Sequence, residues 1–285
     1  MQYRQLGGTG EKVSMIGMGG IVVSGLSQAE ADAAVAEAID SGVNYIDVAP
    51  TYGDAEERLG GALVGKRDHV FLACKTTQRT RAEAEDELNR TLSRLRTDHA
   101  DVYQMHGLDK PEELATALGP GGALEAFEAA RAAGKIRFIG ITGHFVDNLC
   151  AAVDTGNFDT VLFPVSFAQF EMAGSGPELM RLAADRGIGR LAIKAAAKGH
   201  WAEGEEHIYP KCWYKPISRK DLFELSIRYA LSQDISAALP PGDLGLFRMA
   251  LDVAKRFEPI DAEGVAALRD AAGEFTPLFE PRKGS

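Results

Sequence analysis

The sequence predicts an α/β protein folded as a (β/α)8 barrel, the TIM barrel, and three observations predict it. Short segments rich in β-forming residues alternate with segments that carry helix start and stop signals. The β-rich segments recur about every 30 residues with a helical segment in each gap, as repeated strand–helix units do. The length of 285 residues suits one barrel domain that spans residues 1–285.

The eight expected strands follow one another along the chain. They cover residues 14–18, 44–48, 70–75, 101–106, 136–142, 160–165, 188–194 and 235–239. An open, doubly wound sheet shows the same alternation and is the alternative fold. Its dinucleotide-binding turn has the order Gly-x-Gly-x-x-Gly after the first strand, and residues 17–21 (Gly-Met-Gly-Gly-Ile) lack that order. The barrel is therefore favoured.

Three connecting segments complete the expected fold. Residues 3–14 have glycines between two short extended runs, which predicts an N-terminal β-hairpin that caps the lower end of the barrel. Ser27 followed by Glu30 is a capping-box pattern that begins a helix, and Gly42 ends that helix. Residues 195–216 carry no helical pattern and several aromatic residues, so we expect a long loop after strand seven, acting either as a lid or as packing on the barrel rim.

Composition argues against several classes of protein. With 31 basic and 41 acidic residues the net charge is −10, which repels nucleic acid and anionic lipid. No apolar run approaches the roughly 20 residues of a membrane helix, and no apolar export signal follows Met1, so we expect a soluble, cytoplasmic protein. Three scattered cysteines predict neither a disulfide framework nor a metal site, and the oligomeric state is left open.

Four ionisable residues stand at or just after the ends of neighbouring expected strands. Asp47 lies at the end of strand two with Tyr52 beyond it, Lys75 ends strand three, and His106 ends strand four. The active site of a parallel barrel is built where the strands end, so these side chains are expected on one rim. Each residue alone is more often structural, but together they predict an active site.

These residue types in combination indicate carbonyl reduction. A tyrosine hydroxyl has a pKa of about 10, so it acts as an acid near neutral pH only beside a group that stabilises its phenolate. Lys75 can stabilise the phenolate of Tyr52, and Asp47 can keep the Lys75 ammonium charged. His106 can hydrogen-bond the carbonyl oxygen of a substrate.

Several motifs resemble those of the aldo-keto reductase family. Residues 44–53 (Asn-Tyr-Ile-Asp-Val-Ala-Pro-Thr-Tyr-Gly) and 56–60 (Glu-Glu-Arg-Leu-Gly) look like its signature, residues 102–106 (Val-Tyr-Gln-Met-His) resemble its fourth strand, and residues 3–14 and 134–141 are similar to it as well. The resemblance implies reduction of a small aldehyde or ketone by a nicotinamide cofactor held across the barrel top. It also implies Tyr52 as proton donor, tuned by Lys75 and Asp47, with His106 orienting the carbonyl.

The resemblance further suggests which residues hold the cofactor. Thr142 stands where the family has the first residue of a Ser-Asn pair, and Lys194 stands where many members have a stacking tyrosine. Residues 239–248 lack the family's usual phosphate-binding pattern, which leaves Arg248 as the candidate for a 2′-phosphate. Together with Gly19 and Gly242 these are the expected cofactor contacts. We expect NADPH, with NADH possible.

Two other functions remain open from the sequence. Lys75 and Lys194 both stand at strand ends, where an uncharged lysine could form a Schiff base, so a lyase or aldolase is the first alternative. An ion pair with Asp47 would keep Lys75 protonated and argues against that role for Lys75. A non-catalytic barrel that only binds a cofactor is the second alternative, because a fold does not guarantee a function.

Overall fold

The computed structural model describes residues 1–280, in which eight parallel strands form one sheet surrounded by helices. Neighbouring strands follow the chain order from β3 to β9, and β12 pairs with β9. Each expected strand overlaps an observed one, and the (β/α)8 fold is confirmed. The strands are β3 (Met18–Gly19), β4 (Tyr45–Asp47), β5 (Phe71–Thr76), β6 (Ala100–Met105), β7 (Ile136–Thr142), β8 (Thr160–Pro164), β9 (Gly189–Ile193) and β12 (Ala237–Ala238).

Hydrogen bonds between the first and last strands close the sheet into a barrel. The Gly17 amide donates to the Ala238 carbonyl at 3.0 Å, and the Ala238 amide donates to the Met15 carbonyl at 2.9 Å. The first strand is shorter than expected because Ser14 pairs instead with Tyr3 in the N-terminal hairpin. Closure leaves no open sheet edge.

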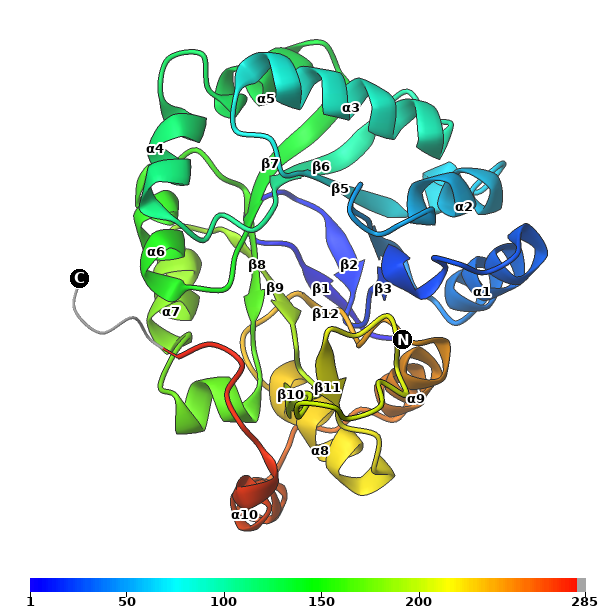
Figure 1. The fold of residues 1–285 in the computed structure, drawn as a ribbon, viewed down its shortest axis with the longest axis vertical. Helices are drawn as coiled ribbons and strands as arrows, with labels where there is room; N and C mark the ends of the chain where they lie inside the picture. The colour runs from blue at the N-terminus through cyan, green and yellow to red at the C-terminus, as the bar shows by residue number, and fades with distance from the viewer. Residues whose placement is uncertain (281–285) are drawn as a thin grey trace.

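Helices form an outer ring around the strands, as Figure 1 shows. α1 begins where the capping box predicted, since the Ser27 hydroxyl accepts from the Glu30 amide and the Glu30 carboxylate accepts from the Ser27 amide. The helices are α1 (Gln28–Asp40), α2 (Ala55–Ala62), α3 (Arg81–Leu95), α4 (Pro111–Leu118), α5 (Ala123–Ala132), α6 (Val146–Asp154), α7 (Pro177–Asp185), α8 (Lys220–Leu231), α9 (Leu244–Lys255) and α10 (Ala262–Asp270). None in residues 1–280 is long and apolar enough to cross a membrane.

The expected N-terminal hairpin, β1 (Tyr3–Gln5) with β2 (Lys12–Ser14), lies across the ring in Figure 1. Leu6 and Val13 pack against the inward-facing residues of the strands in the barrel interior. The Gly8 amide donates to the Gly187 carbonyl just before β9, and the Ser236 hydroxyl donates to the Gln5 carbonyl just before β12. The hairpin therefore closes the end of the barrel where these strands begin, leaving their carboxyl ends for a site.

Residues 195–216 are not one long loop, contrary to expectation. β10 (Ala197–His200) and β11 (Tyr214–Pro216) pair antiparallel and form a second hairpin beyond the end of β9. Its register shifts between Ala197 and Gly199, where Gly199 has a φ of +156° and lies against Thr276. The expectation of no helix in this segment is met, and the irregular register explains why no strand alternation was recognised.

Candidate active site

The expected catalytic residues meet in one cavity at the carboxyl ends of the strands. β4 ends at Asp47, β5 carries Lys75 next to its last residue, and His106 directly follows β6. Tyr52 comes from the turn between β4 and α2. All four line a cavity of about 400 Å³, a size that suits a small ligand or part of a cofactor.

Lys75 and Asp47 form a buried ion pair at the bottom of this cavity. Their side chains are 1% and 2% exposed, and the Lys75 Nζ donates to the Asp47 Oδ1. Gln104 Nε2 donates to the other carboxylate oxygen at 3.1 Å. Burial is the largest single effect and opposes the charge on Lys75, but Asp47 and Tyr52 together outweigh it, and the pKa of Lys75 is raised. Lys75 is therefore a fixed cation.

The Tyr52 hydroxyl lies 3.4 Å from the Lys75 Nζ. Burial raises the pKa of Tyr52 above its usual value, and the positive charge of Lys75 opposes part of that rise. The sequence led us to expect that Lys75 stabilises the phenolate of Tyr52, and Lys75 does act in that direction, but burial is the larger effect on the pKa. Tyr52 thus carries its proton at neutral pH, beside a cation that can stabilise the phenolate once the proton leaves.

His106 packs edge-on against Tyr52, with ring centroids 6.0 Å apart and planes at 89°. Its backbone amide donates to the Thr76 carbonyl at 2.8 Å, which fixes the residue beyond the end of β6. Burial, and then the charge of Lys75, lower the pKa of His106 to about 3. The imidazole is therefore neutral near pH 7, and its buried Nδ1 has no hydrogen-bond partner within residues 1–280.

Four of the five expected cofactor contacts line the same cavity: Gly19, Thr142, Lys194 and Gly242. The Thr142 hydroxyl oxygen accepts from the Gly107 amide at 2.9 Å, so its own O–H remains available to donate to a ligand. A Cβ on Gly242 would lie 2.6 Å from Ile21, whereas a Cβ on Gly19 would meet only Ile21, at 3.6 Å. A larger residue at position 242 would thus push on Ile21, which also lines the cavity.

Arg248 does not reach the cavity. It lies on α9 with its side chain 53% exposed and forms a bidentate ion pair with Glu37 of α1. Its first partner is thus a carboxylate on the outer helical ring, which the local sequence could not reveal because Glu37 is 211 positions away. The helix N-terminus itself is capped by Asp243, whose carboxylate accepts from the Leu246 amide.

The second hairpin covers one side of the cavity. Lys211, Cys212, Trp213 and Tyr214 line it, so this part of the expected aromatic loop does contribute to the site. Burial raises the pKa of Cys212, which keeps that thiol protonated. Trp201 instead stacks on His207 at 4.6 Å, and neither of these rings lines the cavity.

Sequence reasoning missed several polar residues of the site, and Gln104 and Lys211 show two different reasons. Gln104 stands two residues before His106 on β6, and alternation along the strand would have placed both on the same face. Lys211 donates to the Val22 carbonyl at 2.8 Å across 189 residues. No local signal in the sequence distinguishes it from an ordinary surface lysine.

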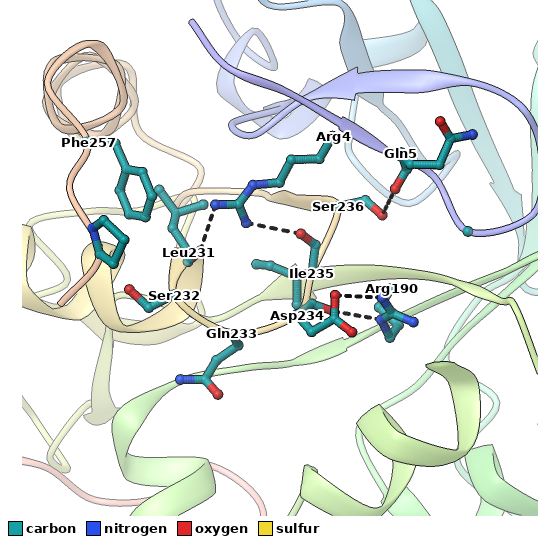
Figure 2. Close-up of a pocket in the computed structure, with 12 residues that line it drawn as sticks. Arg4, Gln5, Arg190, Leu231, Ser232, Gln233, Asp234, Ile235, Ser236 and Phe257 are labelled. Carbon is teal, nitrogen blue, oxygen red and sulfur yellow. Dashed lines mark hydrogen bonds and ion pairs between the residues drawn. The ribbon is translucent and has the colours of Figure 1, made fainter. Parts of the chain in front are cut away.

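A larger cavity of about 640 Å³ lies at the opposite end of the barrel, beside the N-terminal hairpin (Figure 2). Its charged groups are already engaged: Arg4 donates to the carbonyls of Leu231 and Ile235, and Arg190 pairs with Asp234. In parallel barrels this end contributes to stability, while the catalytic residues lie at the other end. Within residues 1–280, no group of three His, Cys, Asp or Glu side chains could hold a metal ion.

Comparison with known proteins identifies the family. The model described as "Aldo/keto reductase family" matches residues 15–240. Two Bacillus subtilis relatives, aldo-keto reductase YhdN and the uncharacterized oxidoreductase YqkF, are 29% and 28% identical over 70% of this chain, which spans 63% and 66% of their lengths. L-galactose dehydrogenase of Arabidopsis thaliana is 27% identical over 99% of this chain and 96% of its own.

A solved structure supports the fold over nearly the whole chain. An aldo-keto reductase from Bacillus halodurans, in its holo form, superposes with a TM-score of 0.75 and covers 98% of both chains at 22% identity. The matched range, residues 15–240, contains the four expected catalytic residues Asp47, Tyr52, Lys75 and His106. From the match to most of its sequence and from this architecture, the chain belongs to the aldo/keto reductase family.

Proposed function

We propose that the protein is an NAD(P)H-dependent oxidoreductase that reduces an aldehyde or ketone to the alcohol, with Tyr52 as proton donor. The observation that carries this proposal is the Tyr52 hydroxyl 3.4 Å from a buried lysine whose charge is held by Asp47. His106 lines the same cavity as a neutral imidazole. Proton donor, phenolate stabiliser and carbonyl ligand are thus within one cavity.

The roles of the residues follow from this arrangement. A carbonyl oxygen between Tyr52 and His106 accepts a hydrogen bond from each, which polarises the carbonyl bond. A bound nicotinamide would supply the hydride that the carbonyl carbon needs. Tyr52 gives its proton to the carbonyl oxygen, so the product is an alcohol. Lys75 stabilises the phenolate left on Tyr52, and Asp47 keeps Lys75 charged and in place.

The cavity suits an anionic nicotinamide cofactor. Its lining carries one carboxylate, Asp47, and Lys75 already neutralises it. We propose that Gly19, Thr142 and Gly242 contact the cofactor, with the Thr142 hydroxyl as a donor. Lys194 and Lys211 add positive charge to the lining.

For the choice of cofactor we propose NADPH, with NADH as the alternative. Arg248 can bind a 2′-phosphate only by leaving Glu37. Their ion pair is about half exposed, so water screens it and a phosphate can compete for the guanidinium. Fluorescence titration with each cofactor, read from Trp201 and Trp213, decides the question. Tighter NADPH binding that weakens in Arg248→Met supports the proposal, and tighter NADH binding assigns the cofactor as NADH.

A Schiff-base reaction is the second candidate, and one observation favours it for Lys194 alone. Burial, with the charge of Lys75 adding to it, lowers the pKa of Lys194 to about 8, so a fraction of its amine is uncharged at neutral pH. Lys75 lacks this property because Asp47 raises its pKa. Borohydride reduction in the presence of an aldehyde, followed by mass spectrometry, would reveal an adduct on Lys194 if this candidate were correct.

Turnover tests the proposed function against both alternatives. We expect purified protein to oxidise NADPH or NADH, followed at 340 nm, when butanal or benzaldehyde is added, and to form the alcohol. Cofactor binding without turnover of any aldehyde would instead indicate the non-catalytic barrel. Single-domain organisation over residues 1–285 and a cytoplasmic location remain predictions, and residues 281–285 lie outside the described part of the chain.

A further inference from the structure

Lys194 is a partly buried cation without an anionic partner. It directly follows β9 and lines the same cavity as Tyr52 and His106. Within residues 1–280 no carboxylate forms an ion pair with it and no acceptor hydrogen-bonds its ammonium. Its Nζ lies instead over two aromatic rings of the second hairpin, 4.3 Å from the centroid of Tyr214 and 4.8 Å from that of Trp213. Aromatic faces compensate only part of the hydration that a buried ammonium loses.

The backbone at this residue adds a second observation. Lys194 has a φ of +65°, one of two non-glycine residues with a positive φ in residues 1–280. This left-handed conformation is unfavourable for a residue with a Cβ, and glycine or asparagine would adopt it more readily. Strained backbone of this kind is concentrated at ligand-binding and catalytic sites. A structural turn therefore does not explain why a lysine stands here.

The charges of the cavity lining indicate which kind of ligand fits it. The lining carries three lysines but one carboxylate, and the tyrosines and His106 are neutral at pH 7. His144 also lines the cavity, and its ring pairs with the Asp109 carboxylate at 2.8 Å. Asp47 neutralises Lys75, while Lys211 donates to the Val22 carbonyl and has Asp243 and Asp54 near it. Among the lysines of the lining, Lys194 is the one with no anionic partner in residues 1–280, and the like charge of Lys75 acts on it. A bound oxyanion would remove this repulsion.

We infer that Lys194 binds an oxyanion of the reactants and that this oxyanion is a carboxylate on the carbonyl substrate. The inference rests on the proposed function and names its substrate class, an aldehyde or ketone that also carries an acid group. Cofactor phosphate is the other source of an oxyanion. The substrate is favoured because the charge of Lys75 acts on Lys194 and Tyr52 is close enough to act on Tyr214, which lies under the Lys194 ammonium. Lys211 instead donates to the Val22 carbonyl and has Asp243, the N-cap of α9, near it.

A matched pair of substrates tests the inference. Succinic semialdehyde and butanal have the same chain length, and only the first carries a carboxylate. We expect the wild-type protein to prefer succinic semialdehyde. Lys194→Met keeps the aliphatic length and removes the charge, so its KM for succinic semialdehyde should rise about 10- to 100-fold, as loss of a hydrogen bond to a charged group predicts. Its kcat/KM for butanal should fall much less, because butanal has no carboxylate for Lys194 to bind.

Two further variants serve as controls. Lys194→Arg keeps a cation and should restore part of the affinity for succinic semialdehyde. Lys255→Met removes an exposed lysine near the end of α9 and should change neither substrate's KM. Binding of succinate, read from Trp213 fluorescence, tests the same site without turnover. It should be saturable in the wild-type protein and at least tenfold weaker in Lys194→Met.

The possible failures are distinguishable. No turnover of either aldehyde would overturn the proposed function, and absent succinate binding would overturn the anion site. Turnover without preference for the acid, or an equal loss for both aldehydes in Lys194→Met, would overturn the substrate assignment. Weaker NADPH binding in that variant, with unchanged succinate binding, would assign Lys194 to the cofactor instead. An adduct on Lys194 after borohydride treatment would also overturn the inference that Lys194 binds the substrate carboxylate.

Discussion

Replacing Asp47 by asparagine should destabilise the protein far more than the loss of one polar contact suggests. The Lys75 ammonium is 1% exposed, and its other acceptors are neutral, the Val48 carbonyl and the Tyr52 hydroxyl, both at 3.4 Å. Neither can compensate a buried positive charge. Removing one partner of a buried ion pair costs about 3–5 kcal/mol. We expect about 3 kcal/mol, since the asparagine oxygen can still accept one hydrogen bond.

A double-mutant cycle isolates the ion pair. Lys75→Met should cost about 3 kcal/mol as well, because it leaves the Asp47 carboxylate buried with only Gln104 as donor. The combined Asp47→Asn, Lys75→Met variant buries no charge at this point, so it should lose only about 1–2 kcal/mol. The two single losses should therefore be strongly non-additive, with a coupling free energy of several kcal/mol.

Urea unfolding followed by circular dichroism, with thermal melts in parallel, measures these differences. A loss of about 3 kcal/mol corresponds to a fall in Tm of about 6–10 °C in a chain of this size. Glu128→Gln, at an exposed position on α5, is a control that should stay within about 0.5 kcal/mol of wild type. If the double variant is as unstable as the two single losses added together, the two side chains do not form the buried ion pair described here.

The remaining predictions concern pH. Burial lowers the pKa of His106 in the folded protein to about 3. Below about pH 6.5 the unfolded chain therefore binds this proton more readily than the folded protein does. The free energy of unfolding should fall as pH drops from 6.5 towards 3. In His106→Gln this fall, measured by urea unfolding at pH 4–7, should be shallower, and an equal slope would contradict a neutral buried imidazole. Lys194 has a pKa of about 8 and loses its charge above that pH, so the KM for succinic semialdehyde should rise between pH 7 and 9 while that for butanal stays constant. Among its neighbours, Lys75, Cys212, Tyr52 and Tyr214 have raised pKa values and keep their protons in this range, and Lys194→Met should abolish the pH effect. A pH effect that persists in Lys194→Met would assign it to another group, such as Lys211.

The barrel and the grouping around Tyr52 could be predicted because both depend on local sequence. Each barrel strand is a short apolar run bounded by turn residues, and a parallel barrel brings every strand end to the same rim, so Asp47, Lys75 and His106 converge whatever the details of packing. The ends of the first strand were less predictable because Ser14 belongs to the hairpin.

What could not be predicted depends on contacts between distant segments. Whether Arg248 faces a ligand or Glu37 is decided by the packing of α9 beside α1, which local residues do not encode. Lys211 reaches the cavity only because the second hairpin folds back over it, and that hairpin has an irregular register. The effect of burial on the pKa of Tyr52 could not be predicted for a similar reason, since burial is a property of the whole fold.

The most direct test of the central claim compares wild-type protein with Tyr52→Phe, which removes one oxygen and keeps the ring against His106. Cofactor dissociation constants come from fluorescence titration, and kcat comes from cofactor oxidation at 340 nm with a saturating aldehyde. The account predicts unchanged cofactor binding and a kcat lowered about 10²- to 10⁴-fold, as expected for loss of a general acid. A Tyr52→Phe protein with the kcat of the wild type would contradict it.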